Sequence, residues 1–176
     1  TKLPVMLSAS SPIRDWMTFA GSACFDRRCF GFRGASGIDG TLSLGMGLSI
    51  EKGQLVLITG DIALLHDTNG WLFSKNQFTN LIIILIDNGG GGIFRQLKID
   101  EISQGDIEKL FTMPQEVSPL KLVEAYGVPY RQVLCLEDLE KAIEWAFSIS
   151  RTVMIRICTK SCEDNELRKN LLDQVI

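Results

Sequence analysis

The sequence predicts a doubly wound α/β fold, in which helices cover both faces of one parallel β-sheet. Apolar runs alternate with amphipathic stretches along most of the 176 residues, as in strands that are joined by crossover helices. Most runs are apolar throughout, without clean alternation, which is typical of strands covered on both faces. With 45% hydrophobic residues, a chain of this length can bury a real core. We therefore expect a single domain over residues 1–176.

The pattern assigns each element in turn. Strands are expected at 29–32, 54–59, 81–87, 130–136 and 152–158. Helices are expected at 12–20, 38–50, 67–76, 120–126 and 136–149, with a polar terminal helix at 161–176. Pro12 suits a first helical turn, and Gly127 stands where a left-handed residue ends a helix. The chain opens in loop-like sequence without Met, which indicates a piece of a longer protein.

Composition excludes several classes of protein. The net charge of -3 gives no basic face for nucleic acid. The longest aliphatic run, at 81–86, is far shorter than the roughly 20 residues that a membrane-spanning helix needs, so we expect no transmembrane segment. Five cysteines without a CxxC pair, together with one histidine, indicate reduced thiols and no zinc site.

Unusual residues follow three of the expected strands. RGASGIDG (33–40) follows the first, GDIA (60–63) follows the second, and DNGGGG (87–92) follows the third. The carboxyl ends of parallel strands lie at one edge of a sheet, and ligands of such folds bind there. We therefore expect these three loops to form one site.

Asp61 and Asn88 are the centre of this expected site. Their separation of 27 positions leaves room for a loop, a helix and a return strand, which brings both to one edge. A carboxylate, an amide oxygen and a backbone carbonyl make half a shell for Mg²⁺, which phosphate oxygens and water complete. The four glycines at 89–92 let the backbone approach a ligand closely. The pattern favours a magnesium diphosphate clamp, although each motif alone also occurs in ordinary turns and mobile loops.

These motifs also carry a resemblance to a known family. A GD motif followed 27 positions later by the second residue of an Asn-Asn-like pair resembles the signature of thiamine diphosphate enzymes. With SSPIRD, RGASGIDG, GDIALLHDTNG and DNGGGGIF, residues 8–97 resemble the 2-succinyl-5-enolpyruvyl-6-hydroxy-3-cyclohexene-1-carboxylate synthase (MenD) family. The chain departs from that family's pattern at Ala9, Phe32 and Asp87, where Asn is usual.

The resemblance implies the C-terminal, diphosphate-binding domain of a three-domain enzyme that uses thiamine diphosphate with Mg²⁺ or Mn²⁺. It implies that Asp61, Asn88 and the carbonyl of Gly90 hold the metal, while Ile38, Gly60, Ile62 and Ala63 contact the cofactor. Arg14 and Arg33 would bind substrate carboxylates, because arginine binds carboxylates bidentately, and Ser10 is a further candidate for this pocket. Ile93, Phe94 and Leu97 match the apolar wall beside the thiazolium ring.

The implied reaction is decarboxylation of 2-oxoglutarate and addition of the succinyl unit to isochorismate, toward menaquinone or phylloquinone. The active site would be shared with an N-terminal pyrimidine-binding domain of a second subunit, in a homodimer or homotetramer, so that the fragment alone is inactive. Bacterial cytoplasm and plastid stroma both suit such an enzyme.

Two other functions compete with this reading. One is another thiamine diphosphate-dependent 2-oxo acid decarboxylase or carboligase, similar to acetolactate synthase, which RGASGIDG and the two arginines disfavour. The other is a non-catalytic nucleotide-binding module, although the sequence has no Walker or GxGxxG fingerprint.

Overall fold

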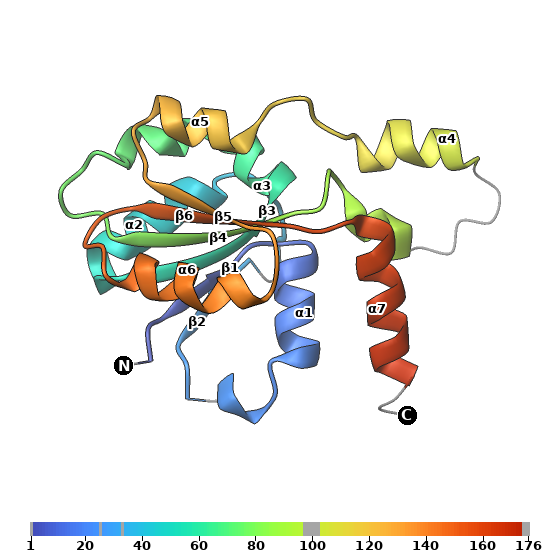
Figure 1. The fold of residues 1–176 in the computed structure, drawn as a ribbon, viewed down its shortest axis with the longest axis horizontal. Helices are drawn as coiled ribbons and strands as arrows, with labels where there is room; N and C mark the ends of the chain where they lie inside the picture. The colour runs from blue at the N-terminus through green and yellow to red at the C-terminus, as the bar shows by residue number, and fades with distance from the viewer. Residues whose placement is uncertain (1, 25, 33, 97–102, 174–176) are drawn as a thin grey trace.

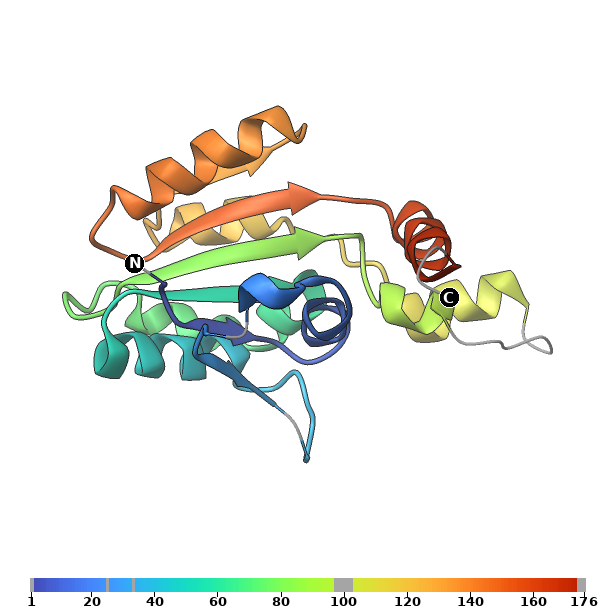
Figure 2. The ribbon, with the colours of Figure 1, turned by 90° about the horizontal axis from the view of Figure 1, so that it is seen from below.

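Six parallel strands form one sheet in the order β2–β1–β3–β4–β6–β5 (Figures 1 and 2). The computed structural model describes residues 2–24, 26–32, 34–96 and 103–173. The strands are β1 (Val5–Leu7), β2 (Cys29–Gly31), β3 (Leu55–Gly60), β4 (Leu81–Asp87), β5 (Tyr130–Val133) and β6 (Val153–Cys158). Every neighbouring pair in the sheet is parallel.

Helices cover both faces of this sheet, which confirms the predicted doubly wound fold (Figure 1). Helices α1 (Ser11–Phe19) and α6 (Glu137–Phe147) cover one face. The other face is covered by α2 (Thr41–Lys52), α3 (Asp61–His66), the 3-10 segment η2 (Thr68–Phe73) and α5 (Pro119–Ala125). The remaining helical segments are η1 (Ser22–Cys24), η3 (Gly92–Gln96), α4 (Gln104–Ile107), the π-helical η4 (Glu108–Thr112) and α7 (Ser161–Asp173). None of the described helices is long and apolar enough to cross a bilayer.

Neighbouring residues of the central strands point into opposite cores. Leu57 and Ile83 pack with Trp71 in the core beneath α2, η2 and α5. Val56 and Ile82 instead pack in the core beneath α1 and α6. Each such buried aliphatic side chain contributes about 1.5–3 kcal/mol to stability. Because both faces are covered, the central strands β3 and β4 are apolar along most of their length, as the sequence indicated.

Strand β1 is an element that the sequence did not predict. Val5–Leu7 are all buried, and the strand pairs with β2 on one side and β3 on the other. Three residues are too few to show a period, so the opening segment looked like a loop, and that expectation is wrong at Val5–Leu7. The loops after β2 and β3 therefore lie at the same sheet edge with β1 between them.

The helix expected at 67–76 is also wrong. The chain enters α3 directly at Asp61, and Thr68–Phe73 form a 3-10 segment. Asp67 instead caps another helix: its Oδ2 accepts a hydrogen bond from the backbone N–H of Ser43 at 2.6 Å, and its Oδ1 accepts one from the Ser43 hydroxyl at 3.0 Å. Helix α2 accordingly begins at Thr41 and not at Ile38. The helical segments between Gln104 and Thr112 were not expected. All five cysteines are unpaired in the structure.

Candidate active site

A cavity of about 910 Å³ lies at the carboxyl edge of the sheet. It is lined by residues that follow β1, β2, β3 and β4, and by residues of α1, η3 and α7. Because β2 and β3 lie on opposite sides of β1, the chain leaves this edge in two directions, and a crevice of this kind is where ligands bind in doubly wound folds.

The structure brings the described candidate residues together around this cavity. Eleven of them line it: Ser10, Arg14, Ile38, Gly60, Asp61, Ile62, Ala63, Asn88, Gly90, Ile93 and Phe94. Two further candidates, Arg33 and Leu97, lie outside the described residues. The sequence analysis expected these residues to lie in one place, and the structure brings them together there. The role of each residue stays a prediction.

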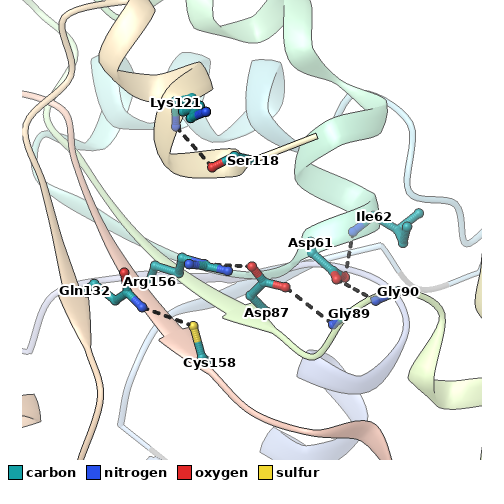
Figure 3. A network of polar contacts seen from close by, with 10 residues as sticks. All are labelled: Asp61, Ile62, Asp87, Gly89, Gly90, Ser118, Lys121, Gln132, Arg156 and Cys158. Atoms are coloured by element: carbon teal, nitrogen blue, oxygen red, sulfur yellow. Dashed lines mark hydrogen bonds and ion pairs between the residues drawn. The ribbon is translucent and has the colours of Figure 1, made fainter. Parts of the chain in front are cut away.

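Asp61 is the buried acid of the site. Only 7% of the residue is exposed. Its Oδ1 accepts a hydrogen bond from the N–H of Ile62 at 2.8 Å, and its Oδ2 accepts one from the N–H of Gly90 at 2.6 Å (Figure 3). Burial raises the pKa of Asp61 from 3.8 to about 6; the Ile62 N–H opposes this rise, and the nearby charge of Asp87 adds to it.

Asp87 has a cationic partner of its own. The Nε of Arg156, on the neighbouring strand β6, donates to Asp87 Oδ2 at 2.7 Å (Figure 3). Among the described residues, no cationic side chain makes an ion pair with Asp61. The Asp61 carboxylate is thus the one left to balance a bound cation, whereas Asp87 is neutralised by Arg156 within the sheet.

Three of the four glycines in the loop, Gly90 to Gly92, pack closely against other residues of the protein. Gly90 has φ 130°, and a Cβ atom there would lie 2.3 Å from the carbonyl oxygen of Thr112. A Cβ atom on Gly92 would lie 2.7 Å from Nδ2 of Asn88. The glycines were expected to admit a ligand; the structure adds that they seat the loop on η4 and leave room for the Asn88 amide.

The oxygen donors of this loop fit a hard divalent cation. Asp61, Asn88 and Gly90, which carry a desolvated carboxylate, an amide and a backbone carbonyl, all line one cavity. The Gly90 carbonyl accepts a hydrogen bond from the Gly92 N–H at 2.8 Å, which leaves its second lone pair for another partner. In the described part of the chain, no three His, Cys, Asp or Glu side chains cluster to hold a metal. A cation here would therefore need ligand oxygens or water as well, as Mg²⁺ does beside phosphate groups.

A cationic side chain and an apolar wall complete the cavity. Arg14 lies on α1, where its Nη1 donates to the carbonyl oxygen of Ser10 at 2.8 Å. Ser10 has φ 76°, and a backbone that is strained in this way often belongs to a functional site. Ile93 and Phe94 lie on η3, and the Phe94 ring packs on Phe111 with 5.6 Å between ring centroids. The cavity thus offers a charge for anionic groups and an apolar surface.

Sequence reasoning missed one side of the cavity. Helix α7 contributes Asp164, Leu167, Arg168 and Leu171 to the lining. Residues 161–176 looked like a polar terminal helix without a role in the site. The only sequence signal was the spacing of Leu167 and Leu171, which places both on one helix face and is common on any helix.

Comparison with known proteins agrees with this geometry. A family model described as thiamine pyrophosphate enzyme, C-terminal TPP binding domain, matches residues 16–157. A 2-succinyl-5-enolpyruvyl-6-hydroxy-3-cyclohexene-1-carboxylate synthase of Prochlorococcus marinus (strain NATL1A) is 65% identical over 98% of this chain. The synthase of the same name from Synechococcus sp. (strain CC9902) is 54% identical over 96% of this chain. These similarities confirm the resemblance drawn from the sequence motifs.

The chain spans 29% of the length of the first of these relatives and 30% of the second. A crystal structure of benzoylformate decarboxylase from Polynucleobacter necessarius has a similar fold, with a TM-score of 0.65. The match covers 92% of this chain and 31% of that one at 19% sequence identity, so it shows the fold alone.

Proposed function

Because the chain belongs to the C-terminal TPP-binding domains of thiamine pyrophosphate enzymes, we propose that it is the diphosphate-binding domain of a 2-succinyl-5-enolpyruvyl-6-hydroxy-3-cyclohexene-1-carboxylate synthase. The complete enzyme would decarboxylate 2-oxoglutarate and add the succinyl unit to isochorismate, toward menaquinone or phylloquinone. The 65% identity to a synthase of that name supports the assignment.

One observation carries the proposal: a single cavity combines two kinds of binding surface. Asp61, Asn88 and Gly90 border it with the hard oxygen donors that suit a metal and a diphosphate. Arg14 and the apolar η3 segment border the same space. A carboligation between two carboxylate-bearing substrates needs both surfaces beside one cofactor.

In this proposal the chain holds and orients the cofactor. Asp61, Asn88 and the Gly90 carbonyl would hold Mg²⁺ or Mn²⁺, and through it the diphosphate. Gly60, Ile62 and Ala63, where β3 passes into α3, would border the diphosphate, and Ile38 would support the cofactor's bent shape. When bound, thiamine diphosphate supplies the carbanion chemistry that joins the two substrates.

The other side of the cavity would bind the substrates. Arg14 would bind a carboxylate, with Ser10 in the same pocket, and we assign the same role to Arg33. Ile93 and Phe94, together with Leu97, would keep water from the reacting carbon and so protect it from protonation.

The rest of the enzyme would lie in the part of the polypeptide that this chain does not span. We propose that a pyrimidine-binding domain from a second subunit of a homodimer or homotetramer completes the site, so that the 176-residue chain alone is inactive. A bacterial cytoplasm or a plastid stroma would suit an enzyme with free thiols.

The test uses the complete polypeptide with thiamine diphosphate and Mg²⁺. Loss of isochorismate absorbance is followed with 2-oxoglutarate as donor, and again with pyruvate. Consumption is expected with 2-oxoglutarate only. Arg14→Ala is expected to lower kcat/KM roughly 10- to 100-fold, because a charge-assisted hydrogen bond contributes about 1.5–3 kcal/mol.

Arg28→Ala is the matched control, since it removes the same charge from an exposed residue outside the cavity. It is expected to leave kcat/KM unchanged. If isochorismate is untouched while pyruvate releases CO₂, the enzyme is another 2-oxo acid decarboxylase and the proposed reaction is wrong.

A further inference from the structure

Helix α7 borders the cavity although no core anchors it. It follows β6 and lies beyond the carboxyl ends of the strands, beside α1 (Figures 1 and 2). None of its described residues is buried. Leu167 is 58% exposed and Leu171 37% exposed, yet both line the cavity. Hydrophobic burial therefore does not fix the position of this helix.

Polar contacts fix it instead. The hydroxyl of Thr159 donates to Asp164 Oδ2 at 2.7 Å and ties the first turn of the helix to the end of β6. Further along, Asn165 Nδ2 donates to the carbonyl oxygen of Arg95 on η3 at 3.0 Å. Arg168 then makes a bidentate pair with Asp15 on α1, with Nε to Oδ1 at 2.7 Å and Nη2 to Oδ2 at 2.5 Å.

These contacts join the two sides of the cavity through one helix. Asn165 links α7 to the segment that carries Ile93 and Phe94. Arg168 links it to the helix that carries Arg14, the residue next to Asp15. Because both links come from the same rigid helix, the distance between the apolar wall and the cationic wall depends on them.

We infer that Arg168 and Asp15 are a positioning pair that holds α7 as a third wall of the substrate cavity. The inference rests on the proposed function for the identity of the substrates. Leu167 and Leu171 would then limit the space that is left for the larger substrate, isochorismate. The metal and diphosphate donors lie on the loops after β3 and β4, so cofactor binding does not depend on the pair.

An ion pair that is partly exposed contributes little to the stability of a whole domain. The side chains of Arg168 and Asp15 are 21% and 37% exposed. Removing the pair should therefore leave the sheet folded and loosen α7 selectively. A bidentate arginine–carboxylate pair also fixes orientation, which a single contact does not.

The first measurement is amide hydrogen exchange in the complete polypeptide without cofactor. Arg168→Met is expected to accelerate exchange in α7 about three- to fivefold and to leave β4 unchanged. Asp15→Asn is expected to do the same, and the double variant is expected to add nothing, because both changes break one interaction. Lys169→Met is the matched control: it removes a charge from an exposed neighbour outside the cavity.

The second measurement distinguishes a positioning role of Arg168 from a general loss of structure in the site. In Arg168→Met, KM for isochorismate is expected to rise about fivefold, while the Kd of thiamine diphosphate with Mg²⁺ changes less than twofold. Unchanged exchange in α7, or equal weakening of cofactor and isochorismate binding, would overturn the inference. If the unaltered enzyme does not consume isochorismate, the proposed function fails, and the exchange data still decide whether the pair holds α7.

Discussion

Asp61→Asn is expected to abolish metal-dependent binding of thiamine diphosphate and to remove a pH dependence of stability. The variant removes the one carboxylate in the proposed metal site. Even residues that only support a metal ligand cost about 10- to 100-fold in affinity when they are changed, so loss of the ligand itself should cost at least about 100-fold. Calorimetric titration of the complete polypeptide with Mg²⁺ and thiamine diphosphate measures this.

The pH dependence follows from the raised pKa of the same group. Since the folded-state pKa of Asp61 is about 6 and the ordinary value is 3.8, the protonated form favours the folded chain. That contribution is complete below about pH 4 and is lost as the pH rises through about 6. The difference between the two pKa values of Asp61 corresponds to about 3 kcal/mol of folding stability at most. Urea denaturation of the metal-free chain should reveal this decline, and Asp61→Asn should flatten it.

Asp87→Asn is the control for the binding measurement. It removes a neighbouring carboxylate that already has Arg156 as a partner and that is not a proposed ligand. Metal-dependent binding should persist in this variant. Full cofactor binding by Asp61→Asn would show that the metal is held elsewhere.

Gly90→Ala is expected to destabilise the chain far more than the same change at the adjacent Gly89. A Cβ atom at Gly90 would lie 2.3 Å from a backbone oxygen, and backbone cannot rotate away as a side chain can. Backbone strain and overpacking together should cost about 3–5 kcal/mol. Gly89 has φ 80° but no atom within 4 Å of its added Cβ, so only the left-handed strain of about 1–2 kcal/mol applies.

Urea denaturation of the two alanine variants and the unaltered chain measures both costs. The pair is closely matched, because both positions have positive φ and both lie in the same loop. Equal destabilisation at the two positions would mean that the loop moves off η4 at little cost, and the packing explanation for the glycines would be wrong.

The pattern of apolar and polar residues predicted those strands and helices that a short stretch of sequence is enough to identify. The six-residue aliphatic run within β4 is recognisable because both of its faces are buried. The donors Asp61 and Asn88 were placed together because a crossover between parallel strands returns the chain to the same sheet edge. The resemblance supplied the individual roles, which spacing alone does not.

What the sequence missed depends on contacts between distant residues. Asp67 looked like part of a helix of its own, but its side chain caps α2 through Ser43, 24 positions earlier. Arg168 meets Asp15 across 153 positions, and the motif SSPIRD, which ends at Asp15, gives no sign of this partner. No local period reports such pairs, so the side of the cavity that they hold in place could not be predicted.

The position of β1 between β2 and β3 has a consequence for self-association. A shortened chain that began at the first helix would lose this strand, although it has only three residues. β2 would have no neighbour, and β3 would become an open edge with the run Leu55–Ile58 and unpaired backbone groups. Long apolar edges of this kind pair with other chains and aggregate. Val5–Leu7 therefore also protect the solubility of the domain.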